Sequence, residues 1–381
     1  MELPTKILTA VNEWLTPIFD KETHDEIKEM MTSSPKNLEE SFYKNLELKP
    51  VNSLKNLNLL FYWVEVFCYY VSLYIKVLIL RMSSPKKVFL CIAMDGDLGD
   101  MVASEPILPR LNQKFKDTHI TWITSKKHFP VFENHPLVDQ LVDQKYTLLS
   151  YLLQRSNPFH HYFNLHLSGF RKDELTGISI SNTKADELGI DLSNYYNHHN
   201  LLEIALQLSD LALEDAQPQI YLDDIPYNTP FEKPYWVIHC KSNAGFRDWT
   251  DENWHHLMKK IIDIWNVNII EIGHVNPLNF THKNFISLVG KTSLPETMKI
   301  MKGASFFIGL DSGPTHLANA FMLPGVILNG KFLNFKTYMS YSGMYKNSQK
   351  VKLLFNESGM AKDLPFDIVW NELCQLISAN S

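Results

Sequence analysis

The stretch FFIGLDSGPTHLANAF, Phe306 to Phe321, holds the clearest change of pattern in the chain. Mostly apolar residues stop at Asp311-Ser312-Gly313-Pro314, and a helical run begins directly after them. A short apolar run that ends at turn residues is typical of a buried strand, and proline suits the first position of a helix. The stretch therefore predicts a strand, a tight turn and a helix.

The predicted helix start offers groups that suit a phosphate. The first N–H groups of a helix lack partners and carry partial positive charge, so they attract phosphate oxygens. Gly313 has no Cβ and lets a ligand approach the backbone, while Ser312 and Thr315 offer hydroxyls. A second interpretation stays open on this stretch alone, in which Asp311 or Ser312 simply caps the helix.

Short apolar runs alternate with amphipathic segments over most of the chain. This alternation predicts an α/β fold with parallel sheets and helices on both faces. We expect a helical N-terminal region at 1–85, an α/β domain at 86–230 and a second one at 231–381, joined at Thr229–Pro234. The candidate strands are Val88–Met94, His119–Ile123, His161–Leu165, Tyr235–Cys240, Val267–Ile272, Ser305–Leu310 and Val326–Asn329.

A second strand-to-helix loop lies in HCKSNAGFRDWTDENWHHL, His239 to Leu257. It places Lys241, Ser242 and Arg247 at the carboxyl end of a strand, which is where open α/β sheets bind ligands. The guanidinium fork matches phosphate oxygens, so Arg247 is a candidate to neutralise a diphosphate. A lone loop arginine is usually only solvated, but two such loops in one domain favour ligand binding.

A third loop lies in the preceding domain, in CIAMDGDLGDMVASEPIL, Cys91 to Leu108. Its acids Asp95, Asp97 and Asp100 would repel phosphate, so the loop is not typical of dinucleotide binding. An acid that faces a cleft can act as general base towards a hydroxyl, and Asp100 is the candidate. The competing interpretation is that Asp100 only caps the next helix.

Composition and charge exclude some classes of protein. Apolar residues make up 45% of the chain and charged residues 20%, which is normal for a soluble globular protein. A net charge of −6 argues against non-specific nucleic-acid binding, so we expect no nucleic-acid partner. The N-terminus shows no signal-peptide pattern. The cysteines are far apart and suggest reduced thiols in a cytosolic protein: Cys68, Cys91, Cys240 and Cys374.

The most apolar segment is LNLLFYWVEVFCYYVSLYIKVLIL, Leu57 to Leu80. Its length would allow it to cross a bilayer, which needs about 20 apolar residues, but Glu65 and Lys76 interrupt it. Its tyrosines suit a membrane interface. A membrane span, a helix on a membrane surface and a helix docked on protein all stay open.

Several segments, taken in order, resemble glycosyltransferase family 9, which contains the bacterial lipopolysaccharide heptosyltransferases. The resemblance covers roughly Lys86 to Gly330, and residues 1–85 have no counterpart in it. The last of the segments is the most specific. They are GDLGDMVASEPILPRL, HITWITSKKHFPVFENHPLVDQLVD, FNLHLSGFRK, VIHCKSNAGFRDWTDENWHHL and LVGKTSLPETMKIMKGASFFIGLDSGPTHLANAF.

The resemblance implies a GT-B architecture, in which two Rossmann-like domains face a cleft, the first for the acceptor and the second for a nucleotide sugar. It implies an inverting, metal-independent transfer, with heptose from ADP-heptose as the expected donor sugar and a glycan or lipopolysaccharide-type acceptor. No cofactor is expected besides the donor itself. The protein would be cytoplasmic, and the membrane-surface interpretation of residues 57–82 would place it on the inner face of the cytoplasmic membrane.

The resemblance also assigns roles by position. Asp100 matches the proposed general base, and Asp97 and His166 fall in the acceptor region, although relatives often carry glutamine in place of His166. Arg247 matches a basic residue that contacts the phosphates. The full set expected at the donor is Lys241, Ser242, Arg247, Gly273, Asp311, Ser312, Gly313, Thr315 and His316.

Two other functions compete with a transferase. One is another sugar-nucleotide enzyme on the same architecture, such as an epimerase, because fold alone does not determine the reaction. The other is a non-catalytic binding or assembly protein. We expect no metal site at the paired histidines, because adjacent side chains point in different directions: His160-His161, His198-His199 and His255-His256.

Overall fold

The computed structural model describes residues 56–380, apart from 169–170, 173–178, 181, 198, 226, 233, 243–244 and 358. Most of the predicted N-terminal helical region, residues 1–55, lies outside the described residues.

The chain forms two compact units that interleave along the sequence. The first unit holds the residues up to Asp95, Phe115–Lys126 and Asp139–Leu192. The second unit holds Gly96–Lys114, Lys127–Val138 and Ser193–Ser381. The linear boundaries at 86–230 and 231–381 stay a prediction.

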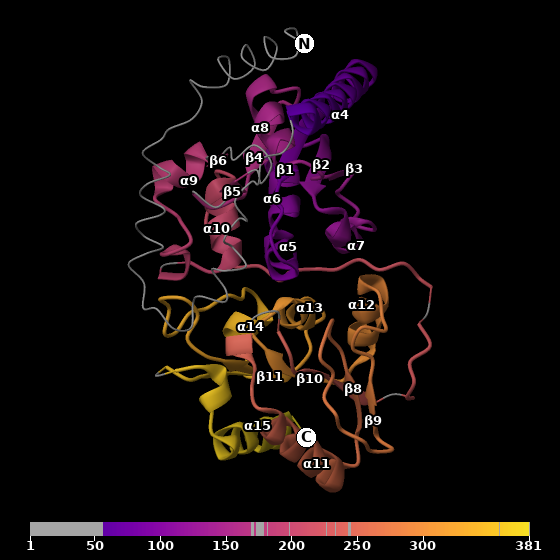
Figure 1. Cartoon of the computed structure of the whole chain (residues 1–381), viewed down its shortest axis with the longest axis vertical. Coiled ribbons are helices and arrows are strands. Elements are labelled where there is room, and N and C mark those ends of the chain that lie inside the picture. Colours follow the sequence, from indigo (N-terminus) through magenta and orange to yellow (C-terminus); the bar gives the residue numbers. More distant parts are fainter. Residues whose placement is uncertain are drawn as a thin grey trace. The chain divides into compact units, whose positions relative to one another are not determined.

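A parallel sheet with the strand order β3-β2-β1-β4 forms the centre of the first unit (Figure 1). Strand β1, which lies between β2 and β4, is almost entirely buried. Its sequence is a continuous apolar run, as expected when both faces of a parallel sheet are covered. The strands are β1 Val88–Ala93, β2 Thr118–Thr124, β3 Gln140–Asp143 and β4 His161–Asn164. The first unit also contains β5 Arg171–Lys172, β6 Ser179–Ile180, α8 Thr147–Ser156 and α9 Thr183–Leu188.

Helix α4, Asn56–Ser83, begins the described part of the first unit. Its residues Val66, Leu73 and Val77 are buried in one apolar cluster with α8 and β1. By length and composition Phe61–Ser83 would suffice to cross a membrane, although a single helix of this kind is weak evidence. The large apolar side chains that α4 exposes are Phe61, Val64, Phe67, Ile75, Leu78, Ile79 and Met82.

A larger parallel sheet, in the order β12-β11-β10-β7-β8-β9, forms the centre of the second unit. Its strands are β7 Tyr235–His239, β8 Asn268–Glu271, β9 Phe285–Ser287, β10 Phe306–Leu310, β11 Gly325–Asn329 and β12 Val351–Phe355. Every candidate strand expected from the sequence is present in one of the two sheets, so the α/β fold class is confirmed.

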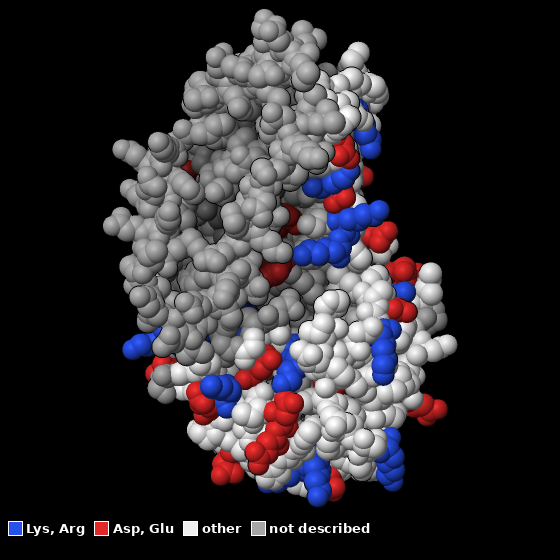
Figure 2. All heavy atoms as spheres, viewed as in Figure 1, with Lys and Arg blue, Asp and Glu red and all other residues white. Residues whose placement is uncertain are grey.

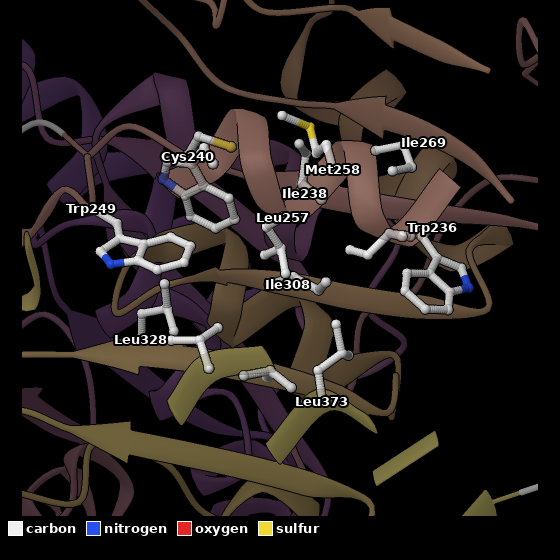
Figure 3. Close-up of a cluster of buried hydrophobic side chains, with 14 of the residues drawn as sticks. Trp236, Ile238, Cys240, Trp249, Leu257, Met258, Ile269, Ile308, Leu328 and Leu373 are labelled. Atoms are coloured by element: carbon white, nitrogen blue, oxygen red, sulfur yellow. The ribbon is translucent and has the colours of Figure 1, made fainter. Parts of the chain in front are cut away.

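The core of the second unit lies between one face of this sheet and two helices (Figure 3). Helices α11, Asp251–Trp265, and α15, Phe366–Asn380, lie side by side over that face. Alternate residues of β7, Trp236 and Ile238, point into this core, as the period of a strand requires.

Other helices cover the opposite face of the sheet. Tyr235 of β7 points there and donates its hydroxyl to the Ile300 carbonyl of α12, Leu294–Gly303, at 2.8 Å. Helix α13, Gly313–Ala320, packs against α12 and against α5, Leu98–Ser104. The remaining helices of or near the second unit are α6 Ile107–Phe115, α7 Phe129–Phe132, α10 Leu201–Leu208 and α14 Met344–Asn347.

Charged side chains of both signs are interspersed over the described surface drawn in Figure 2. On that face, the described residues form no broad basic area. This distribution is in keeping with the net charge of −6, and the expectation that nucleic acid is not a partner stays a prediction.

Candidate active site

Two neighbouring strands of the second unit place the centre of the site. Strands β7 and β10 pair in parallel, with Gly309 opposite His239, so their carboxyl ends lie next to each other. His239 ends β7, and Asp311-Ser312 follows β10 directly. The carboxyl ends of parallel strands are where α/β sheets bind ligands, so this edge is where a donor site is expected.

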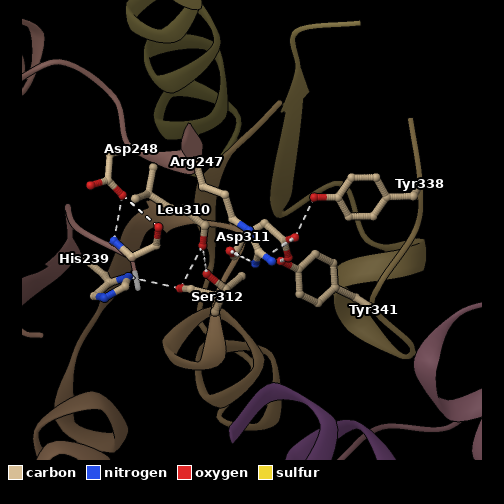
Figure 4. Close-up of polar contacts among 10 residues, drawn as sticks. His239, Arg247, Asp248, Leu310, Asp311, Ser312, Tyr338 and Tyr341 are labelled. Carbon is tan, nitrogen blue, oxygen red and sulfur yellow. Dashed lines mark hydrogen bonds and ion pairs between the residues drawn. The ribbon is translucent and has the colours of Figure 1, made fainter. Parts of the chain in front are cut away.

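Asp311 is held by side chains rather than by its own turn (Figure 4). Asp311 is 6% exposed. Its two carboxylate oxygens accept hydrogen bonds from the hydroxyls of Tyr338 and Tyr341, each at 2.6 Å. Burial, followed by the charge of Asp311, raises the pKa of both tyrosines well above the usual range, so both hydroxyls stay protonated. Asp311 therefore does not cap α13.

Arg247 approaches the same acid from the loop after β7. One guanidinium nitrogen, Nη1, donates to the Asp311 main-chain carbonyl at 3.1 Å and lies 3.8 Å from the carboxylate oxygen Oδ2. The guanidinium also lies 4.2 Å from the centre of the Phe332 ring. Burial, the largest single effect, would lower the pKa of Arg247, but the Asp311 carboxylate and the neighbouring tyrosines together outweigh burial and raise that pKa. A cation and a buried acid thus share this edge of the sheet.

Ser312 precedes the first residue of α13 but its hydroxyl does not cap the helix. The hydroxyl donates to the Leu310 carbonyl at 3.1 Å and lies 3.0 Å from Nδ1 of His239. Because a hydroxyl has a single hydrogen, the His239 Nδ1–H is then the donor to Ser312. Burial lowers the pKa of His239 to about 4, so the ring is neutral near pH 7.

The first turn of α13 is more enclosed than the sequence suggests. The Thr315 hydroxyl donates to the Leu310 carbonyl, and Thr315 is fully buried. A Cβ at Gly313 would lie 2.9 Å from the Leu98 Cβ, so the glycine is required for the packing of α5 on α13. The structure thus gives Gly313 a packing role, whether or not a ligand also approaches it.

His316 lies between α13 and α5. Its ring is 4.7 Å from the ring of Tyr341, and a Cβ at Gly99 would lie 2.7 Å from its Cδ2. Burial lowers the pKa of His316 to about 4, helped by the charge of Arg247 and opposed by that of Asp311. His316 is therefore a neutral, enclosed ring near pH 7.

Asp100 lies in the first turn of α5, within the second unit. Its carboxylate accepts the N–H of Asp97 at 2.8 Å, which is half of a capping box at the start of the helix. Burial and the neighbouring Tyr196 are the largest effects that raise the pKa of Tyr195. The negative charge of Asp100 raises this pKa further, and so does that of Asp311. The charges of Asp100 and Asp311 thus both act on Tyr195. Asp97, the N-cap residue of α5, contacts Asp100 through its main-chain N–H.

The remaining donor candidates have local partners. Lys241 pairs with Asp251, and the Ser242 N–H and hydroxyl both donate to Asp248, at 2.7 and 2.8 Å. Gly273 follows β8 beside His239, whose Cδ2 would lie 3.7 Å from a Cβ there. Part of the Lys241–Arg247 loop, residues 243–244, lies outside the described residues.

His166 lies in the first unit, where both nitrogens of its ring form hydrogen bonds. Nε2 accepts the N–H of Asp95 at 3.0 Å, so Nδ1 carries the proton and donates to Oδ1 of Asn164 at 2.6 Å. Asp95 in turn accepts the N–H and the hydroxyl of Ser125. The ring is thus fixed in one tautomer, and its role at an acceptor stays a prediction.

Sequence reasoning missed Tyr338, Tyr341, His239 and Phe332. The aromatic spacing of TYMSYSGMY, residues 337–345, was the available signal, but nothing local connects these rings to a turn 27 residues earlier. Over the residues that the structure describes, no group of three or more histidine, cysteine, aspartate or glutamate side chains is placed to hold a metal ion.

Comparisons with known proteins show which family this chain is similar to. Residues 192–362 match the family described as Glycosyltransferase family 9 (heptosyltransferase). A relative, lipopolysaccharide heptosyltransferase 1 of Campylobacter coli, is 24% identical in an alignment of 291 residues that covers 61% of this chain and 81% of the relative.

Solved structures with the same fold include two proteins of E. coli. ADP-heptose lps heptosyltransferase II has a TM-score of 0.56 and 16% identity over 77% of this chain and 99% of its own. The bacterial iron-containing dodecameric glycosyltransferase TibC has a TM-score of 0.53 and 16% identity over 77% of each chain. With this fold and this match over residues 192–362, the chain is similar to the glycosyltransferases of family 9 and has the GT-B fold.

Proposed function

We propose that this glycosyltransferase transfers a heptose from ADP-heptose to a glycan of the lipopolysaccharide type. The observation that carries the proposal is that Arg247 lies beside the buried Asp311 at the carboxyl ends of β7 and β10. A guanidinium at that position suits a diphosphate. The names of the two heptosyltransferases above support heptose as the sugar and a lipopolysaccharide core as the acceptor.

The proposed reaction is a direct displacement that inverts the anomeric carbon. Asp100 accepts the proton of the acceptor hydroxyl while that oxygen attacks the anomeric carbon. A new carbon–oxygen bond to the acceptor forms, and the bond between the anomeric carbon and the phosphate oxygen breaks. The electron pair of the broken bond leaves with the nucleoside diphosphate.

The leaving diphosphate gains charge, and cationic and dipolar groups can stabilise it. Arg247 supplies a fixed positive charge, and the N–H groups at the start of α13 supply partial charges. One preorganised donor of this kind is worth about 3 kcal/mol in the transition state, by analogy with oxyanion holes. This donor set supports a transfer without a metal ion, in contrast to the iron named for TibC.

The substitution Asp100→Asn tests the proposed base. Because the amide cannot accept the proton, we expect the rate of transfer to fall by roughly 10²–10⁴. Asn keeps the size of the side chain and its hydrogen bond to the Asp97 N–H, so ADP affinity and melting temperature should be close to wild type. Transfer is measured as ADP release with a lipopolysaccharide core acceptor, with and without a chelator.

Asp263→Asn, an exposed acid of α11, is the matched control and should keep full activity. Unchanged transfer in Asp100→Asn would rule out the proposed base. Conversion of the donor sugar without acceptor would support an epimerase instead. A wild type that binds ADP and consumes no nucleotide sugar with any acceptor would support a binding protein. Loss of activity with the chelator, restored by a metal ion, would contradict metal independence.

We also infer that α4 places the protein on the cytoplasmic face of the membrane. The helix is apolar on its exposed side as well as on the side that packs against the first unit. Lys76 and Arg81 on the helix and Lys86 just after it suit the anionic lipids of a cytoplasmic leaflet. A helix of this kind lies in the interface with its apolar side chains among the acyl chains.

Vesicle sedimentation of the full chain tests this contact. We expect binding to vesicles that contain phosphatidylglycerol and weaker binding to pure phosphatidylcholine. Replacing both Phe67 and Ile79 by glutamate should reduce binding by at least about tenfold, since each buried side chain contributes roughly 1.5–3 kcal/mol. The control is Ile264→Glu, an exposed apolar residue of α11. Equal binding of both variants to the vesicles would exclude α4 as the contact.

A further inference from the structure

Asp311 receives its hydrogen bonds from a distant segment of the chain. Tyr338 and Tyr341 lie between β11 and α14, and each hydroxyl donates to a different oxygen of the carboxylate, Tyr338 to Oδ2 and Tyr341 to Oδ1 (Figure 4). A buried carboxylate without such donors would be costly, so the tyrosines stabilise its charged form in place. Both oxygens of Asp311 are thus occupied by neutral donors.

Arg247 does not form a close ion pair with this carboxylate. The distance of 3.8 Å from Nη1 to Oδ2 is longer than the 2.7–2.9 Å of a charge-assisted hydrogen bond. The guanidinium bonds to the Asp311 main-chain carbonyl instead and lies over the Phe332 ring. Without competing donors, a carboxylate beside a guanidinium would form a direct, often bidentate pair.

We propose that Tyr338 and Tyr341 are positioning residues of the donor site, because they hold the Asp311 carboxylate away from Arg247. The guanidinium then does not commit its N–H donors to the Asp311 carboxylate and can direct them towards a diphosphate group. The Arg247 side chain is 23% exposed, so an incoming anion has access to it. This inference rests on the proposed function, in which Arg247 binds the diphosphate.

The tyrosine rings pack in an aromatic cluster, so a purely structural role is the competing explanation. Tyr338 stacks on Tyr196 at 4.8 Å, and Tyr341 lies 5.6 Å from Tyr345. Substitution by phenylalanine keeps these ring contacts and removes only the hydroxyls. Tyr345 offers a matched control, since its buried hydroxyl has no hydrogen-bond partner in the part of the chain that the structure describes.

Calorimetric titration of the full chain with ADP is the first test. We expect the double variant Tyr338→Phe/Tyr341→Phe to bind ADP about tenfold more weakly, the size of one lost hydrogen bond to a charged group. Tyr345→Phe should stay within about twofold of wild type, because no bond is lost. In an Asp311→Asn background the two tyrosine substitutions should change ADP affinity no further. An equal loss in both backgrounds would indicate packing alone and overturn the proposal.

A crystal structure of the double variant without ligand is the second test, and it does not depend on nucleotide binding. We expect the Asp311 carboxylate to move into direct hydrogen-bond contact with Arg247. A carboxylate that stays 3.8 Å away would overturn the proposal. If the wild type fails to bind ADP while the carboxylate moves as expected, the positioning role stands and the donor assignment of the proposed function fails.

Discussion

The turns that carry Asp100 and Asp311 look alike in sequence and differ in how each acid is held. Both acids follow an apolar strand and stand at the start of a helix of the second unit. Asp100 bonds to the N–H of Asp97, three residues earlier. Asp311 bonds to hydroxyls 27 and 30 residues further along the chain.

This difference suits the two acids to different tasks. The Asp100 carboxylate accepts a hydrogen bond within its own turn, and its charge raises the pKa of Tyr195, which the charge of Asp311 also raises. A carboxylate held by two tyrosines and next to an arginine is fixed by separate elements, as a preorganised electrostatic group should be. The first arrangement suits the proposed proton acceptor and the second a fixed part of the donor site.

Of the glycine substitutions at these two turns, Gly96→Ala is expected to give the larger effect on transfer, because it disturbs the turn that holds Asp100. A Cβ at Gly96 would collide with the Asp100 carboxylate, which is the far end of a flexible side chain and can rotate away. Misplacing a catalytic group by about 1 Å can reduce the rate roughly 100-fold. We therefore expect transfer to fall by about that factor, measured as ADP release, while the melting temperature changes little.

Gly245→Ala is the control for this substitution, since a Cβ there would meet nothing within 4 Å. Full activity in Gly96→Ala would show that the position of the Asp100 carboxylate is unimportant for transfer. A large fall in melting temperature would show instead that this turn is held as firmly as the Asp311 turn. Either outcome would remove the contrast between the two acids.

The sequence predicted the sheets well because their strands are apolar runs ended by turn residues. Strands β1, β7 and β10 are buried almost throughout. Their continuous apolar patterns can therefore be recognised without any knowledge of the rest of the chain. The strands that were missed are short or half-buried. Strand β9 has three residues and β3 has four, and β12 lies at the sheet edge with mostly half-buried residues.

The candidate site was predictable in its members more than in its contacts. Arg247 and Asp311 were expected in one site from separate loops, and the structure places them together. The tyrosines that hold Asp311 were missed, because a contact over 27 residues leaves no local pattern. Ser312 and Thr315 were expected to offer hydroxyls to a ligand, yet both hydroxyls donate to the Leu310 carbonyl.

Gly313→Ala is expected to give a smaller effect, and this effect should fall first on the stability of the fold rather than on the rate of transfer. A Cβ there would meet the Leu98 Cβ, which belongs to a packed helix and cannot rotate away as a carboxylate can. We expect the free energy of unfolding in urea to fall by at least about 1 kcal/mol, as for other overpacked cores. Gly245→Ala, in open space, again serves as the control.

Activity per folded molecule separates the two roles that remain for Gly313. If the glycine serves only the contact between α5 and α13, the folded fraction of Gly313→Ala should release ADP at a rate within a few-fold of wild type. If the start of α13 also binds the diphosphate, the KM for the donor should rise while the stability loss stays the same. Unchanged stability would mean that α5 can shift on α13. The turn at Asp311 would then accommodate an added Cβ as readily as the turn at Asp100.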